Sequence, residues 1–87
     1  MSYKSRIEQK LATLTPLSLD VIDESQNHHG HSGWKEGGET HFRVRIVASA
    51  FTGQNRLARH RIINALLADE LAERVHALAI EARAPGE

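Results

Sequence analysis

The stretch HFRVRIVA at residues 41–48 decides the fold. Apolar residues occupy every second position from its second residue onward, and a histidine and two arginines stand between them. A period of two predicts a β-strand that buries one face and leaves the other in solvent. We expect His41, Arg43 and Arg45 to lie on the solvated face.

A helix and a strand precede this stretch. Pro16 ends the helix, because proline lacks an amide hydrogen and crowds the preceding turn. Apolar and polar residues alternate again from Leu17 to Val21, and Ile22 departs from the alternation near its end. This pattern predicts a strand paired antiparallel with residues 41–48. The helix itself is predicted from apolar residues at spacings of four, four and three, namely Tyr3, Ile7, Leu11 and Leu14.

The segment from Glu24 to Gly38 connects these two strands and is polar and rich in glycine. Structureless loops of this length are uncommon in compact domains and tend to be functional. This one carries His28, His29 and His31. Because neutral imidazoles bind zinc, copper, nickel and iron, we expect adventitious metal binding. The loop is interpreted either as a solvated connection or as a site that buffers metal ions.

Two helices and a last strand are predicted after residues 41–48. Residues 51–53 form a turn, and Asn55 is the N-cap of the next helix, because its side chain can accept a hydrogen bond from the first turn. A short helical continuation covers residues 68–74, and the last strand covers residues 75–82. The first of these helices places four residues on one apolar face: Ala58, Ile62, Ala65 and Leu66.

The element order is therefore helix, strand, strand, helix, helix, strand. An antiparallel pair joined by the histidine-containing loop, a third strand, and helices packed on one face make a two-layer α+β sandwich with a three-stranded sheet. A chain of 87 residues is typical of one domain, and we expect residues 1–87 to form it.

Composition narrows the function. Eleven basic and eleven acidic residues cancel, so no overall field attracts nucleic acid or an anionic membrane, and such contact needs a local patch. The chain has no cysteine, which excludes disulfides, thiol catalysis and a thiolate metal site supplied by this chain alone. No apolar run approaches the ~20 residues that span a bilayer, and the N-terminus lacks the apolar core of a signal peptide. We expect a cytoplasmic protein without membrane contact.

Four short strings stand in a distinctive order along the chain. They are Glu24-Ser25-x-x-His28, Glu39-Thr40-His41-Phe42-x-Val44-x-Ile46-Val47, Phe51-x-Gly53 with Arg59-His60-Arg61, and Val75-His76-Ala77-Leu78 before Ala84-Pro85. In this order and spacing the chain resembles the BolA family over essentially its whole length. The resemblance implies a fold similar to the class II KH domain, partnership with a monothiol glutaredoxin around a shared 2Fe–2S cluster, and, in some members, a transcriptional role.

The same resemblance implies that His76 and one loop histidine are ligands of the shared cluster. His28 matches the family position best, and His31 or His29 is the alternative. Two imidazoles can replace two thiolates on one iron, as in Rieske centres, so a chain without cysteine can hold half of a cluster. The remaining ligands would come from the glutaredoxin cysteine and bound glutathione. The isolated protein, a monomer or weak homodimer, would then hold no cofactor.

Without the resemblance, the sequence pattern does not predict a ligand role for His76. By alternation it begins the last strand and shares a face with Leu78 and Ile80, which is typical of a half-buried histidine whose ring nitrogens are satisfied locally. Two interpretations of this side chain therefore remain, a cluster ligand and a structural residue.

A basic cluster at the start of the helix after Asn55 supports a second hypothesis. Its arginines are either solvated or paired with carboxylates such as Asp69 and Glu70, or they contact an acidic partner or DNA phosphates in a salt-sensitive way. The second contact would suit a regulator of stress or morphology genes, although Arg56 stands where the Gly-x-x-Gly clamp of KH domains has its second glycine. The cluster consists of Arg56, Arg59, His60 and Arg61, and we expect Arg43 and Arg45 of the strand at residues 41–48 to join it.

No catalytic site is predicted. Glu39 and His41 could exchange a proton, but no nucleophile, oxyanion site or paired carboxylates accompany them. We therefore expect the protein to act by binding a partner and not as an enzyme. In the light of the resemblance, its role would be in iron–sulfur cluster trafficking or in iron and redox regulation.

Overall fold

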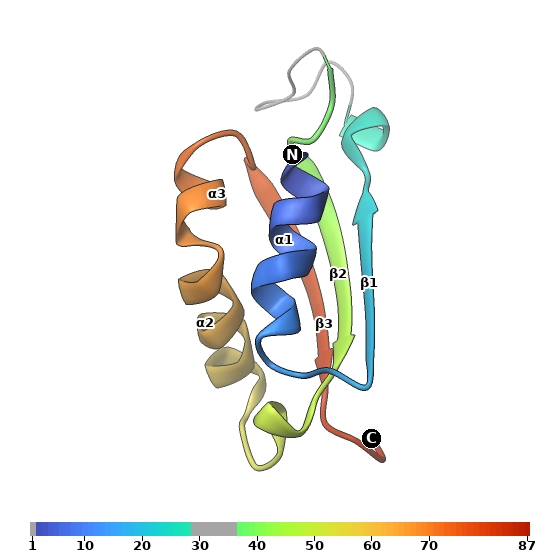
Figure 1. The fold of residues 1–87 in the computed structure, drawn as a ribbon, viewed down its shortest axis with the longest axis vertical. Coiled ribbons are helices and arrows are strands. Elements are labelled where there is room, and N and C mark those ends of the chain that lie inside the picture. The colour runs from blue at the N-terminus through green and yellow to red at the C-terminus, as the bar shows by residue number, and fades with distance from the viewer. Residues whose placement is uncertain (1, 29–36) are drawn as a thin grey trace.

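A computed structural model describes residues 2–28 and 37–87. They form a three-stranded sheet with helices on one face (Figure 1), so the predicted α+β class and element order are confirmed. The elements, with η marking a short 3₁₀ turn, are α1 (Tyr3–Ala12), β1 (Ser18–Asp23), η1 (Ser25–His28), β2 (His41–Val47), η2 (Ser49–Phe51), α2 (Arg56–Leu66), α3 (Ala68–Ala72) and β3 (Ala77–Arg83).

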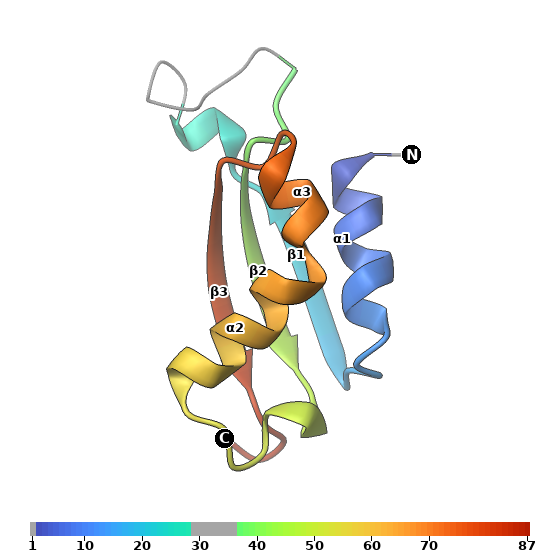
Figure 2. The ribbon, with the colours of Figure 1, turned by 90° about the vertical axis from the view of Figure 1, so that its left-hand side faces the viewer.

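The sheet is mixed, with β2 in the centre. β1 pairs with β2 antiparallel, placing Val21 opposite Val44. β3 pairs with β2 in parallel, placing Ile80 beside Val44. Parallel strands need a crossover connection, and α2 and α3 provide it. Figure 2 shows the two layers that result, with all three helices on the same side of the sheet.

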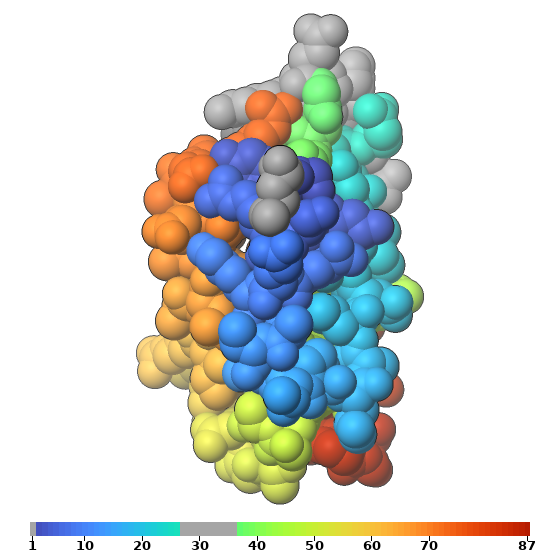
Figure 3. Space-filling view, in the orientation of Figure 1, coloured from blue at the N-terminus to red at the C-terminus, as the bar shows by residue number. Residues whose placement is uncertain are grey.

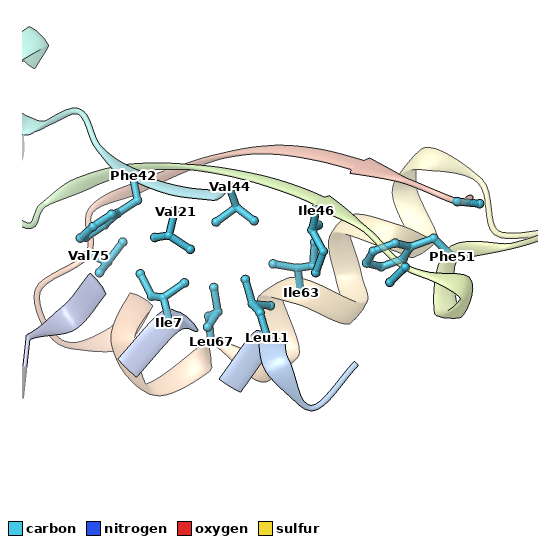
Figure 4. Packing of buried hydrophobic residues seen from close by; sticks show 12 residues of the cluster. Ile7, Leu11, Val21, Phe42, Val44, Ile46, Phe51, Ile63, Leu67 and Val75 are labelled. Carbon is cyan, nitrogen blue, oxygen red and sulfur yellow. The ribbon is translucent and has the colours of Figure 1, made fainter. Parts of the chain in front are cut away.

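The alternation in β2 determines which face of the sheet is buried. Phe42, Val44 and Ile46 are at most 2% exposed and point toward the helices (Figure 4). Ile7 and Leu11 of α1 pack against them. α1 lies in front of the sheet in Figure 1, and its atoms cover this face in the space-filling view (Figure 3). No helix in residues 2–28 and 37–87 is long and apolar enough to cross a membrane.

Ion pairs to a buried carboxylate connect α1 with α3. Glu70 is fully buried, and Arg6 and Lys10, which lie one turn apart on α1, each approach its carboxylate to 2.8 Å. A buried charge is tolerated when it is paired and hydrogen-bonded, and these two cations provide both. Asp69 also contacts Lys10, at 3.4 Å. The prediction that Asp69 and Glu70 pair with the basic cluster is therefore wrong.

The buried stripe of α2 differs from the predicted one by about one residue. Ile63 and Leu67 are at most 1% exposed, whereas Ala65 is exposed. Arg59 lies one turn before Ile63, and its side chain is only 12% exposed. Arg59 therefore lies on the buried side of α2. The guanidinium is satisfied there because it donates to the backbone carbonyl of Ala82 and to the Glu87 carboxylate.

Candidate functional site

His76 lies at the loop end of the sheet, immediately before β3. The strand starts at Ala77 and not at Val75 as predicted. The difference arises because the Val75 N–H still donates to the carbonyl of Glu70 in α3, at 3.0 Å. The His76 N–H donates instead to the carbonyl of Thr40, at 2.7 Å. The backbone of His76 is therefore anchored to the residue that precedes β2.

The His76 side chain is exposed and not half-buried beside Leu78 and Ile80 as alternation predicted, since the residue precedes the strand. Its ring makes no hydrogen bond to the residues that the structure describes. It contacts the ring of His41, with 5.5 Å between centroids and 52° between planes. His76 thus presents an imidazole at the surface while one side of the ring is supported.

His41 is buried, with 4% of its surface exposed. The expectation that it lies on a solvated face is therefore wrong. It shares that face with Arg43, but it stands at the first position of β2, where its ring contacts the ring of His76. Its Nδ1 lies 2.9 Å from the hydroxyl of Thr40. A period of two predicts which face a residue occupies, but it cannot show that a neighbouring segment covers the end of the strand.

Ser25 joins the two ends of the long loop. Its buried hydroxyl donates to the Asp23 carboxylate and accepts from the Thr40 N–H at 2.9 Å. The other Asp23 oxygen accepts from the Glu39 N–H at 3.1 Å. Sequence reasoning missed this network. The Asp-x-Ser spacing was the available signal, because aspartate often accepts from the backbone two residues onward, as Asp23 does from the Ser25 N–H.

The segment that carries one predicted loop ligand lies at the same end of the sheet as His76. His28 is the last residue of η1. Figure 1 shows η1 and the start of β3 at the same end of the sheet, on either side of the start of β2. His29 and His31 lie outside the described residues. In the part of the chain that the structure describes, no group of three or more His, Asp or Glu side chains is arranged to hold a metal ion.

The helix-free sheet face beside His41 carries paired charges. Arg43 contacts Glu24 at 3.0 Å and Glu81 at 2.8 Å, and Arg45 lies 3.3 Å from Glu81. Hydrogen bonds from Arg43 and then Arg45 hold the pKa of Glu81 below its usual value. The charges are thus largely compensated across the strands, and a hollow of about 260 Å³ opens beside them along the first residues of β3.

A basic groove of about 490 Å³ lies between the start of α2 and β3. Its basic side chains come from Arg56, Arg59, His60 and Arg83. Asn55 begins α2 as predicted, since its side chain accepts from the Ala58 N–H at 2.8 Å. The fold therefore brings three members of the predicted basic cluster into one groove and adds Arg83 from β3, which linear spacing could not reveal.

Two members of the predicted basic cluster, Arg61 and Arg59, do not offer a free cation to a ligand in this groove. Arg61 is exposed and does not line the groove. Arg59 donates to both carboxylate oxygens of Glu87, at 2.6 and 2.7 Å. The Arg59 guanidinium, followed by the Ala84 N–H, lowers the pKa of Glu87 to about 2. Arg59 is therefore largely a structural cation, which leaves Arg56 and Arg83 as the exposed cations of the groove.

Comparison with known proteins identifies the family. Residues 11–87 match the family model described as BolA-like protein. Over 100% of its length, the chain is 54% identical to a Sinorhizobium protein described only as lying in the cobS 5′ region, and it covers 96% of that protein. It is 46% identical to the Escherichia coli DNA-binding transcriptional regulator BolA, with 92% of this chain and 73% of that protein covered.

A solved structure agrees with the sequence matches. The BolA domain of SufE1 from Arabidopsis thaliana superimposes with a TM-score of 0.88 at 46% identity, covering 98% of this chain and 94% of that domain. The chain spans only 24% of the whole SufE-like protein 1 of that plant. The described fold and the sequence matches agree over nearly all of the chain, and the protein belongs to the family of BolA-like proteins.

Proposed function

We propose that the protein is a non-enzymatic partner of a monothiol glutaredoxin and that the two proteins share a 2Fe–2S cluster, in cluster trafficking or in iron and redox regulation. The observation that carries this proposal is the exposed and anchored position of the His76 imidazole. It is an exposed imidazole whose backbone is anchored at 2.7 Å to Thr40 and whose ring makes no hydrogen bond to a described residue. Such a ring keeps a nitrogen lone pair for a metal.

The donor set of this chain fits half of such a cluster. His76 and His28 belong to segments that the Ser25 and Thr40 hydrogen bonds tie together. Two histidines can serve one iron. A chain without cysteine needs thiolates from elsewhere, which suits a glutaredoxin cysteine and glutathione. The bound cluster would supply an iron–sulfur unit for transfer or electron exchange, while this chain orients the imidazoles and provides the partner surface.

The test is reconstitution with a monothiol glutaredoxin, iron, sulfide and glutathione, followed by absorption and circular dichroism. We expect a mixed-ligand spectrum with the native chain and its loss with His76→Ala. The matched control is His60→Ala, which removes a histidine from the basic groove and should leave the spectrum unchanged. A spectrum identical to that of glutaredoxin alone would refute the proposal.

The loop ligand requires its own set of variants. His28→Ala, His29→Ala and His31→Ala should be compared one at a time in the same reconstitution. We expect His28→Ala to change the mixed spectrum and to speed loss of the cluster to a chelator, because His28 lies on the segment fixed to Thr40 through Ser25. Loss of the signature in His29→Ala or His31→Ala alone would reassign the ligand.

A second candidate function, binding of DNA by a transcriptional regulator, is favoured by the basic groove. Arg56 and Arg83 are exposed there, and the similar Escherichia coli protein is named a DNA-binding transcriptional regulator. If these two arginines contact phosphates, Arg56→Ala with Arg83→Ala should reduce the slope of log affinity against log salt by about 2. His76→Ala is the control and should keep the native slope. An unchanged slope in the double variant would exclude this groove.

A further inference from the structure

A buried histidine lies directly beneath the proposed cluster ligand. His41 is 4% exposed, and its ring centroid lies 5.5 Å from that of His76 at an interplanar angle of 52°. The tilted arrangement at this separation is one that ring pairs favour. Nothing in the cluster proposal uses His41. Its position nevertheless makes it the aromatic side chain in contact with the His76 ring.

His41 is itself held in place. The Thr40 hydroxyl lies 2.9 Å from its Nδ1, and the Ser25 hydroxyl oxygen lies 3.3 Å from its backbone nitrogen. Ser25 is in turn bonded to Asp23 at the end of β1. A ring that is buried and hydrogen-bonded in this way has few orientations open to it. It can therefore act as a fixed surface for a neighbouring side chain.

Two successive residues therefore restrain His76. The carbonyl of Thr40 holds the His76 N–H at 2.7 Å, and the ring of His41 contacts the His76 ring. The register of the parallel pair places His41 beside Ala77, the residue that follows His76. An exposed histidine without such contacts would sample several rotamers and would lose that freedom on binding a metal.

We propose that His41 is a positioning residue, a buried aromatic platform that holds the imidazole of His76 in the orientation in which it meets the shared cluster. This inference rests on the proposed function and deepens it. Ordering one side chain in advance is expected to be worth about 3- to 10-fold in retention of the cluster. His41 contributes by restricting His76 and not by binding the cluster.

The first test uses the isolated protein and is independent of the cluster. Nuclear magnetic resonance should show contacts between the ring protons of His41 and His76 and a single χ1 rotamer for His76 in the native chain. We expect rotamer averaging in His41→Ala and a single rotamer in His41→Phe, which retains an aromatic ring. An averaged His76 in the native chain, or equal rotamer populations in native and His41→Ala proteins, would overturn the inference without any need for a variant to bind a cluster.

The second test uses the mixed complex with glutaredoxin. We expect His41→Ala to lose the cluster to a chelator about 3- to 10-fold faster than the native chain and to change the circular dichroism of the cluster. His41→Phe should restore both. Phe51→Ala is the control for general destabilisation, because Phe51 is a fully buried ring in η2, at the opposite end of the sheet in Figure 1.

The outcomes separate the two proposals. If the native chain forms no mixed cluster, the proposed function fails, and the rotamer measurement still decides whether His41 orders His76. If the native chain forms the cluster and His41→Ala retains it with an unchanged spectrum, the positioning role fails alone. A change shared equally by Phe51→Ala would reduce the effect to stability and would also overturn the inference.

Discussion

Glu87 illustrates how a single residue couples the end of the described chain to the fold. Its carboxylate accepts two hydrogen bonds from Arg59 and one from the Ala84 N–H. Arg59 also donates to the carbonyls of Gln54 and Ala82. One guanidinium therefore joins the start of α2, the end of β3 and Glu87. An arginine on an otherwise apolar stripe is stable there because its donors are satisfied.

This pair predicts a specific loss of stability in acid. The pKa of Glu87 is lowered to about 2 in the folded protein, so the stabilisation is complete above about pH 5 and is lost as the pH falls toward 2. Glu87→Gln should flatten this part of the dependence of the free energy of unfolding on pH, measured by urea unfolding from pH 7 to 2. In an Arg59→Gln background the same change should have a much smaller effect, because mainly the hydrogen bond from the Ala84 N–H then remains. An equal effect in both backgrounds would contradict the pairing.

At the scale of elements, α1 and α3 are joined by charge as well as by apolar packing. Glu70 is fully buried between Arg6 and Lys10, whereas the neighbouring Asp69 side chain is 77% exposed. Both carboxylates contact Lys10, but Glu70 is buried and also contacts Arg6, whereas Asp69 is exposed. Burial determines how much of an ion pair survives screening by solvent.

Replacing Glu70 should therefore lower the free energy of unfolding far more than replacing Asp69. We expect Glu70→Ala to lower the free energy of unfolding by about 2 kcal/mol, because it removes charged hydrogen bonds from a buried position. Asp69→Ala should change it by less than about 0.5 kcal/mol. Chemical denaturation of both variants at pH 7 measures the difference. Equal losses would show that the Glu70 pairing contributes little beyond a surface ion pair.

For the whole molecule, one continuous apolar core links elements from both ends of the sheet. Val75 packs at the loop end and Phe51 near the other end (Figure 4), and both belong to the same buried cluster. Unfolding of such a core is expected to be cooperative. The loop-end network around Ser25 and the N-cap at Asn55 then contribute to a single free energy of unfolding.

The losses in free energy of unfolding caused by variants at the two ends of the sheet should consequently add. Ser25→Ala removes a buried hydroxyl and should cost about 2 kcal/mol, and Asn55→Ala removes a cap and should cost about 1 kcal/mol. The double variant should lose their sum within about 0.5 kcal/mol, in one urea transition that circular dichroism and nuclear magnetic resonance follow identically. Two separate transitions would contradict the expectation of a single domain.

Local periodicity determined the elements, because each pattern depends on near neighbours in the chain. The alternation in residues 41–48 correctly predicted β2 and its buried face, and Asn55 correctly predicted the start of α2. Periodicity fixed the boundary of β3 less well, since the backbone partner of Val75 lies in α3. The site residues His76 and Arg56 could be selected from the sequence, but their surroundings could not.

Those surroundings depend on partners far away in the chain. Sequence alone determined the fold class, the absence of thiolates and the histidines from which ligands can be drawn. Only the tertiary structure decided that His41 is buried against His76, that Arg59 is bound to Glu87, and that Arg83 joins the basic groove. The reason is physical: burial and pairing are set by contacts between segments that the fold brings together, and no local pattern encodes which segments those are.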